Sequence, residues 1–170
     1  ASSTVGSATG KVRFEQAVGQ PAPDFTLESS GGQPVSLASL RGKNVVLFFN
    51  EGSMCYPGCW NQIKELSNDP RFNSDEIQAL SIVIEPKDTW EEIMREKPDY
   101  ATDRLLFDTD RDAAKAYDVL ALRSSMHRGV YPGHTYFVID KAGVIRYTLD
   151  DPAMGIRNDQ LISEIEKLSS

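Results

Sequence analysis

The sequence predicts one α/β domain in which a central mixed β-sheet is flanked by helices, with an N-terminal extension. Residues 45–49 (VVLFF) form an uninterrupted apolar run, which is typical of a central strand covered on both faces. Short apolar strand patterns alternate with segments of helical spacing along the rest of the chain, which favours layers of helix over sheet. We expect a flexible tail over residues 1–17 and one domain over residues 18–170.

The first half of the chain leads into and out of this central strand. Residues 1–10 are small, polar and without an apolar period, as in a tail. An extended segment is expected over residues 21–27 and a short element over residues 35–40. After the central strand, a segment rich in turn residues precedes a helix over residues 60–66.

The second half continues the alternation and closes with a hairpin and a helix. Gly143 supplies the positive φ of a short turn between two apolar strands, and Asn158 is the expected cap of the last helix. Asp88 or Thr89 is expected to cap an earlier helix. The expected elements are strands over 77–84, 105–107, 136–140 and 144–149 and helices over 89–97, 110–117 and 158–168.

Composition narrows the function classes. The chain has 170 residues, a net charge of −7 and 40% hydrophobic residues, and it contains no cluster of Lys and Arg. A nucleic-acid partner is therefore not expected, and no apolar run is long enough for a membrane span. The small polar start is compatible with the remainder of a removed signal or lipid anchor, which predicts an extracytoplasmic location.

The two cysteines, Cys55 and Cys59, are four residues apart at the strand-to-helix corner. A disulfide across so short a loop stabilises a fold little, which indicates redox or metal chemistry. A helix N-terminus favours the thiolate, and Cys55, which precedes the helix, should be the more exposed. In a regular helix this spacing separates the Cβ atoms by about 5–6 Å, whereas a disulfide needs about 3.5–4.5 Å. Residues 56–58, which include Pro57 and Gly58, must depart from a regular helix if the pair closes.

Three segments together carry a family resemblance. They are PAPDFTLESSGGQPVSLASLRGKNVVLFF from Pro21, LLFDTDRDAAKAYDV from Leu105 and PGHTYFVIDKAGVIRY from Pro132. Over residues 18–168 the chain resembles the thioredoxin-like redoxin superfamily, in particular its alkyl-hydroperoxide-reductase-type, TlpA-type and peroxiredoxin-like members. The resemblance implies a thioredoxin fold, and it makes Pro132 the proline, often cis, that packs opposite the active cysteine.

The first functional interpretation is a thiol–disulfide oxidoreductase without a metal or cofactor. The resemblance gives the nucleophile role to Cys55 and the resolving role to Cys59, although thiol–disulfide members usually carry one residue fewer between the cysteines. Cys55 would attack a disulfide of a protein partner, and Cys59 would resolve the mixed disulfide. A thioredoxin-like protein would exchange electrons with the pair.

The first alternative is a peroxiredoxin-type thiol peroxidase. The segment YPGC resembles the TPGC of one peroxiredoxin class, which would make Cys59 the residue that attacks the hydroperoxide. Two positions depart from that pattern. Tyr56 stands where a Thr hydroxyl is expected, and Gly133 stands near the position of an expected Arg, which Arg123 or Arg128 would have to replace.

The second alternative is a copper-binding or copper-delivery protein. Sco-type proteins share the redoxin fold and carry two cysteines at this spacing with a later histidine. Cys55, Cys59 and His134 match that set in type and order, although Trp60 stands where a Pro is expected. Two thiolates and an imidazole suit copper chemically, while a strand-end histidine more often makes an ordinary hydrogen bond.

Three other side chains near the corner have simpler interpretations. Glu51 is a candidate proton acceptor for Cys55, although a loop carboxylate is more often solvated. Trp60 is expected to pack beside the site, and His127 is expected to lie on a surface loop.

Overall fold

The computed structural model describes residues 7–169. Within them it contains one eight-stranded sheet, four α-helices and several 3-10 turns. The strands are β1 (Ser7–Thr9), β2 (Asp24–Ser29), β3 (Val35–Ser36), β4 (Asn44–Asn50), β5 (Ile77–Val83), β6 (Leu105–Phe107), β7 (His134–Ile139) and β8 (Ile145–Asp150). The helices are α1 (Gly58–Asn68), α2 (Lys87–Glu96), α3 (Asp112–Ala116) and α4 (Asn158–Glu166).

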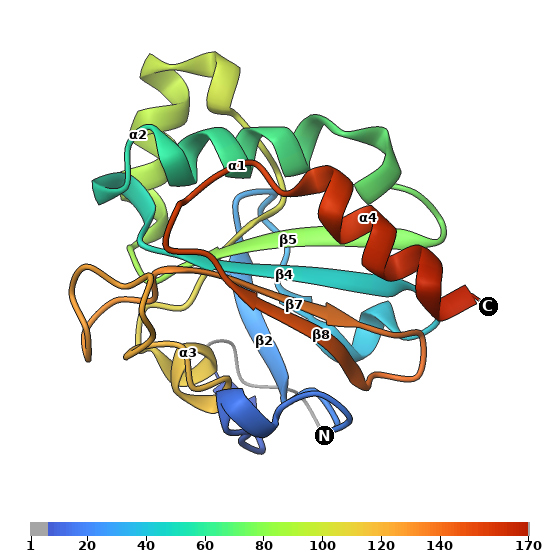
Figure 1. The fold of residues 1–170 in the computed structure, drawn as a ribbon. Helices are drawn as coiled ribbons and strands as arrows, with labels where there is room; N and C mark the ends of the chain where they lie inside the picture. Colours follow the sequence, from blue (N-terminus) through green and yellow to red (C-terminus); the bar gives the residue numbers. More distant parts are fainter. Residues whose placement is uncertain (1–6, 170) are drawn as a thin grey trace.

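The sheet is mixed, as predicted. Its order is β1-β2-β6-β5-β4-β7-β8, with β3 paired to β2. Strand β4 is parallel to β5 and antiparallel to β7, so it lies at the centre between neighbours of both directions. The predicted closing hairpin is formed by β7 and β8 (Figure 1), and Gly143 in its turn has a φ of +86°.

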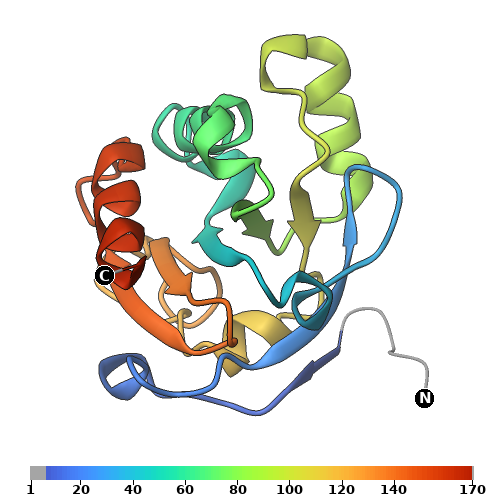
Figure 2. The same cartoon turned by 90° about the vertical axis from the view of Figure 1, so that its right-hand side faces the viewer.

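Every residue of β4 is buried, which confirms the interpretation of the apolar run as a central strand. Because side chains alternate along a strand, β4 contributes to two separate apolar layers. Val46 and Phe48 pack with residues of α1, α2 and α4. Val45, Leu47 and Phe49 pack with residues of α3 and of the N-terminal segment on the other face (Figures 1 and 2).

The N-terminal segment differs from the tail predicted over residues 1–17. Strand β1 pairs with β2, the Val12 N–H donates to the Ala116 carbonyl, and Ala17 is fully buried. Residues 7–17 therefore belong to the folded domain, because backbone pairing to β2 stabilises a segment that has no apolar period of its own. Residues 1–6 lie outside the described residues.

Two predicted helix caps are absent. Helix α2 begins directly after Pro86, with no side-chain cap from Asp88 or Thr89. Asn158 is the first residue of α4 rather than its cap. Its side chain instead accepts from Gln62 and donates to the Glu65 carbonyl, so contacts with α1 replace the local cap.

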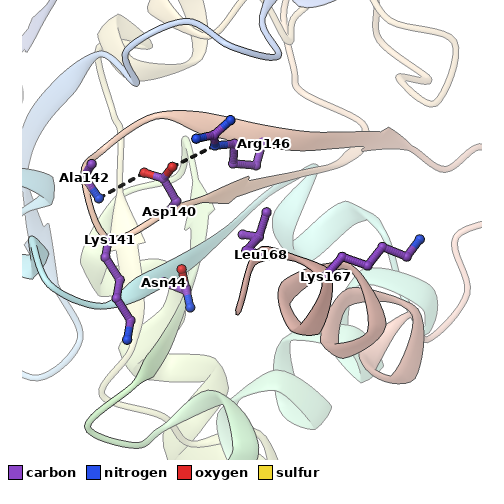
Figure 3. Close-up of a pocket in the computed structure, with 7 residues that line it drawn as sticks. All are labelled: Asn44, Asp140, Lys141, Ala142, Arg146, Lys167 and Leu168. Carbon is purple, nitrogen blue, oxygen red and sulfur yellow. Dashed lines mark hydrogen bonds and ion pairs between the residues drawn. The ribbon is translucent and has the colours of Figure 1, made fainter. Parts of the chain in front are cut away.

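The cysteine corner lies at the carboxyl end of β4, which ends at Asn50. A pocket of about 650 Å³ lies at the opposite end of the strand, beside Asn44 (Figure 3). Its cations are paired, Lys141 with Glu76, Arg146 with Asp140 and Lys167 with Glu164. Within residues 7–169, no helix combines the length and the apolar character needed to cross a membrane.

Candidate active site

A tight turn brings the chain from β4 to the cysteines. The Asn50 side-chain carbonyl accepts a hydrogen bond from the Gly52 N–H at 2.8 Å. Residues Gly52–Met54 then form one 3-10 turn before Cys55. Gly52 has a φ of +72°, and any side chain there would overlap the Glu85 carboxylate. The turn therefore requires glycine for both conformation and space.

Cys55 and Cys59 form a disulfide, with their Cα atoms 5.2 Å apart. Helix α1 begins only at Gly58, and the Tyr56–Pro57 peptide bond is cis. Residues 56–58 thus depart from a regular helix, as the spacing predicts for a closed pair. Cys55 is 8% exposed and Cys59 is fully buried, so the expected order of exposure is also correct.

The start of α1 contacts the more exposed sulfur. Cys59 is the second residue of the helix, and its N–H donates to the Cys55 Sγ at 3.2 Å. Unpaired N–H groups and the dipole at a helix N-terminus favour negative charge. After reduction of the disulfide, this contact stabilises a thiolate at Cys55.

His134 lies against the buried sulfur. It is the first residue of β7, opposite Asn50 in the pairing with β4, and its side chain is fully buried. Its Nδ1 is 3.5 Å from the Cys59 Sγ. Burial is the main reason that the pKa of His134 is lowered to about 4, so the imidazole is neutral at neutral pH.

Neighbouring hydrogen bonds determine which nitrogen of His134 carries the proton. The Arg157 backbone N–H donates to Gln62 Oε1 at 2.7 Å, which fixes the orientation of that amide. The Tyr136 hydroxyl must therefore donate to the same oxygen, also at 2.7 Å. Its own oxygen is left to accept from His134 Nε2 at 2.8 Å. Nε2 is thus protonated, and the unprotonated Nδ1 faces Cys59.

A loop over residues 151–157 closes this side of the site. The Arg157 guanidinium binds the Asp151 carboxylate at 2.7 Å, and the Gly155 N–H donates to the same carboxylate at 3.0 Å. The Gly155 carbonyl lies 3.2 Å from His134 Nε2 and accepts from it. The ion pair between the two ends of the loop therefore holds a second acceptor against the imidazole.

Glu51 differs from the solvated loop carboxylate that is usual at such a position. It is 2% exposed, accepts from the Met126 N–H at 3.0 Å, and pairs with His127 Nδ1 at 3.0 Å. Within residues 7–169, no hydrogen bond or ion pair joins Glu51 to a cysteine. It anchors the loop over residues 120–131 to the corner, and His127 lies on the surface as predicted.

Trp60 packs beside the site, as predicted, and is 8% exposed. Its ring contacts Tyr56 and Trp90, and its Nε1 donates to the Gly52 carbonyl at 3.2 Å. Glu85, which the sequence does not single out, accepts from the Ser53 N–H and from Trp90 Nε1, both at 2.8 Å. Together these side chains hold the turn that carries Cys55.

Three other residues singled out in the sequence are Pro132, Arg123 and Arg128. Pro132 is buried two residues before His134, and its peptide bond is trans. Its role opposite the active cysteine remains a prediction. Arg123 and Arg128 are exposed on the loop over residues 120–131, and no contact given for the described residues joins either to a cysteine.

Several residues that shape the site could not be identified from the sequence. Their roles depend on contacts between residues far apart in the chain, such as that between Gln62 and the Arg157 N–H. Only Tyr136 carried a local signal, because residues two apart on a strand share a face, and His134 is two residues before it. The contributors missed are Gln62, Glu85, Tyr136, Asp151, Arg157 and Met154, whose Sδ lies 3.5 Å from the Cys55 Sγ.

The donor set of the copper alternative is assembled at this corner. The Sγ atoms of Cys55 and Cys59 and a ring nitrogen of His134 all lie within 4.8 Å of one another, and all three residues are buried. The neutral imidazole with an unprotonated Nδ1 is the form in which histidine binds metals. The three residues therefore suit a soft metal ion once the disulfide is reduced.

Comparison with known proteins places the chain in a family. Residues 18–148 match the model of the AhpC/TSA family. Peroxiredoxin Bcp of Bacillus subtilis (strain 168) is 32% identical over 129 residues, which cover 74% of this chain and 80% of that protein. Alkyl hydroperoxide reductase E of Mycobacterium tuberculosis (strain ATCC 25618 / H37Rv) is 34% identical over 136 residues, which cover 76% and 82%.

Solved structures confirm the thioredoxin fold predicted from the sequence. Mycobacterium tuberculosis AhpC matches with a TM-score of 0.75 at 18% identity, covering 91% of this chain and 98% of that chain. Reduced 2-Cys peroxiredoxin of Plasmodium vivax matches with a TM-score of 0.74 at 22% identity, covering 91% and 82%. With its cysteine pair, the chain is a thiol-dependent oxidoreductase, and it belongs to the AhpC/TSA family.

Proposed function

We propose that the protein is a thiol peroxidase in which Cys59 attacks the hydroperoxide and Cys55 is the resolving cysteine. The observation that carries this assignment is the contact between the Cys59 Sγ and the unprotonated Nδ1 of buried His134. Two relatives named as a peroxiredoxin and an alkyl hydroperoxide reductase support peroxide as the substrate class. The match of YPGC to a peroxiredoxin segment supports Cys59 as the attacking residue.

In the first step the Cys59 sulfur attacks the terminal oxygen of the hydroperoxide. The O–O bond breaks, Cys59 becomes a sulfenic acid, and the alkoxide or hydroxide leaves. His134 Nδ1 accepts the thiol proton as the S–O bond forms and passes it to the leaving oxygen. One hydroperoxide is thereby reduced to an alcohol or to water.

In the second step the Cys55 thiol attacks the sulfenic sulfur of Cys59. A disulfide forms and one water molecule leaves, which gives the state that the structure describes. Cys55 is the more exposed sulfur, so an incoming dithiol attacks there and Cys59 leaves. The reductant is a thioredoxin-like protein. Its dithiol reduces the Cys55–Cys59 disulfide to two thiols and is itself oxidised to a disulfide.

One departure from the peroxiredoxin pattern, at Tyr56, bears on how the peroxide is held. Tyr56 is 60% exposed and stacks edge-on against Trp60, so its hydroxyl does not take the place of the expected Thr. Polar contacts at Cys59 come instead from His134, which Tyr136 and Gly155 orient. Activation of the Cys59 thiol thus depends on the His134 imidazole.

Stopped-flow kinetics with hydrogen peroxide and an organic hydroperoxide test the assignment. The reduced protein should lose both thiols rapidly at micromolar peroxide. C59S should lose the fast reaction, because it lacks the attacking sulfur. C55S should keep it and accumulate a sulfenic acid that dimedone traps. Thiol loss at the rate of free cysteine would overturn the proposal.

The same variants distinguish peroxidase activity from protein disulfide exchange. If Cys55 attacks a partner disulfide, C55S abolishes the reduction of insulin and C59S traps mixed disulfides. Fast disulfide reduction together with slow peroxide reduction would make the exchange reaction the function. His134→Ala serves as a further check, since loss of the proton acceptor should slow peroxide reduction by about 100-fold.

Copper carriage is a second candidate function, supported by the cluster of Cys55, Cys59 and His134. Reduced protein should then bind one Cu(I) per chain in competition with bicinchoninate under anaerobic conditions. His134→Ala should weaken this binding, because the imidazole is one of three donors. Equal Cu(I) affinity in wild type and His134→Ala would remove the histidine from the candidate site.

A further inference from the structure

Met154 brings a second kind of sulfur to the cysteine corner. It lies in the loop over residues 151–157, and its Sδ is 3.5 Å from the Cys55 Sγ. The two residues are 99 positions apart in the chain, so only the fold brings them together. A thioether has no proton to lose and is a soft ligand.

The backbone holds Met154 at this place in an uncommon conformation. Its φ is +53°, in the left-handed region that residues other than glycine rarely adopt. The Met154 N–H donates to the Asp151 carbonyl at 3.1 Å, and the neighbouring Ala153 and Gly155 N–H groups donate to the Asp151 carboxylate. Strained residues that the surrounding structure holds in this way cluster at functional sites.

Gly58 provides the space for this approach. A Cβ built on Gly58 would lie 3.2 Å from both the Cβ and the carbonyl oxygen of Met154. Such a contact is tighter than ordinary packing, so a side chain at position 58 would displace the loop. A glycine between the two cysteines therefore allows the Met154 loop to lie against them.

Packing alone does not account for the position of Met154. Its side chain is partly buried, yet it belongs to neither of the two apolar clusters of the described residues. The contact that the structure gives for its side chain is with the Cys55 sulfur. Its position is thus explained better by the cysteines than by the core.

The donors at the corner become four when Met154 is counted. Two thiolates, a thioether and an imidazole form a soft set, and the soft thioether favours Cu(I) over Zn(II). The His134 nitrogen that faces the sulfur atoms carries no proton, because Tyr136 and the Gly155 carbonyl accept from the other one. These acceptors orient the ring as outer contacts do around known metal sites.

We infer that Met154 is the fourth donor of a Cu(I) site formed with Cys55, Cys59 and His134, and that it selects Cu(I) against Zn(II). The inference rests on copper carriage, the second candidate function above. Binding needs the reduced pair and releases the two thiol protons as copper–sulfur bonds form.

Competition titrations of the reduced full chain test this inference. Cu(I) is measured against bicinchoninate and Zn(II) against a zinc-binding dye, without oxygen. M154L keeps an apolar side chain of similar size and lacks the sulfur. It should weaken Cu(I) binding by about tenfold or more and leave Zn(II) binding unchanged. M126Q, which changes a methionine that is 74% exposed, should change neither affinity.

A second variant, M154Q, and X-ray absorption at copper distinguish loss of the sulfur ligand from a change in loop structure. M154Q should lose Cu(I) affinity as M154L does, while X-ray absorption should count one fewer sulfur neighbour of copper in both. Unchanged Cu(I) affinity and an unchanged sulfur count in both variants would overturn the role of Met154 and leave copper carriage standing. Failure of the wild-type protein to bind Cu(I) would overturn copper carriage and the inference together.

Discussion

His134 is a buried imidazole whose environment determines both its charge and its tautomer. It is uncharged because burial lowers its pKa to about 4, and its two ring nitrogens have different partners. Tyr136 and Gly155 accept from Nε2, which leaves Nδ1 as a base or as a metal ligand. The chemistry at Cys59 therefore depends on residues that do not touch the sulfur.

Replacement of Tyr136 by Phe tests this dependence. Without the hydroxyl, Nε2 keeps only the Gly155 acceptor, and the ring can also adopt the tautomer whose Nδ1 donates. We expect Y136F to slow the reaction of Cys59 with peroxide by about tenfold, measured by stopped-flow fluorescence. Y147F, which removes a hydroxyl on β8 that accepts from Gln160 of α4, should have no effect. An equal rate in Y136F and wild type would contradict the role of the hydroxyl.

Part of the site could be predicted from the sequence because its determinants are local. The apolar run before the cysteines and the helical spacing after them place the pair at a strand-to-helix corner. The spacing of Cys55 and Cys59 also implies the irregular backbone of residues 56–58. The orientation of His134 could not be predicted, because it depends on Gln62, which is 95 residues from its partner Arg157.

At the scale of elements, the turn between β4 and α1 is held by contacts from both sides. Glu85 lies beyond the end of β5 and accepts from the Ser53 N–H, while the Trp60 ring on α1 donates to the Gly52 carbonyl. The Glu85 carboxylate occupies the space beside Gly52. Strand, turn and helix therefore fix one another around Cys55.

A pair of glycine substitutions measures this constraint. G52A places a Cβ against Glu85 in a residue with a φ of +72°, whereas G32A meets no atom within 4 Å at a φ of +90°. Both pay the penalty of a left-handed alanine, about 1 kcal/mol. The overlap at position 52 should raise the loss to about 3 kcal/mol. Urea denaturation of the oxidised proteins gives both values, and equal losses would contradict a steric requirement at Gly52.

Elements could be predicted from the sequence where their own residues carry an apolar pattern. The central strand, the hairpin and the closing helix all occur where their apolar periods indicate. The caps of α2 and α4 were wrong, because the Asn158 side chain bonds to α1 rather than to its own helix. Strand β1 was missed, because pairing with β2 stabilises it and its own sequence carries no strand pattern.

At the scale of the whole molecule, α1 and α4 are joined through Asp69. Its carboxylate accepts from the Arg71 guanidinium at 2.7 Å and from the Asn158 side chain at 3.1 Å. The hydrogen bond from Arg71 is the main reason that the pKa of Asp69 is lowered to about 2. This carboxylate therefore contributes to the tertiary structure only while it is ionised.

The pH dependence of stability follows from this lowered pKa. The unfolded chain binds a proton at Asp69 near pH 3.8, and the folded chain binds it near pH 2. The contribution is therefore complete above about pH 4 and is lost as the pH falls toward 2. Because Arg71 is half exposed, we expect D69N to remove about 1 kcal/mol at pH 6 and less at pH 2.5.

Thermal unfolding between pH 2.5 and pH 7 measures this difference. D103N changes a carboxylate that is paired with Arg104 and largely exposed, and it should leave the stability profile unchanged. A loss of stability in D69N that is the same at pH 2.5 and pH 6 would show that the ionised carboxylate is not the cause.

The Cys55–Cys59 disulfide closes within one turn of a single chain. Once Cys59 has been oxidised to a sulfenic acid, closure of this disulfide is therefore an intramolecular step whose rate does not change with dilution of the protein. It needs no second subunit, because both sulfur atoms belong to one chain. The same two atoms cannot hold a metal ion while they are bonded to each other. If the corner binds Cu(I) as proposed, the oxidised and the metal-bound states exclude each other, and oxidation of the pair would lower the share of molecules that can bind the ion.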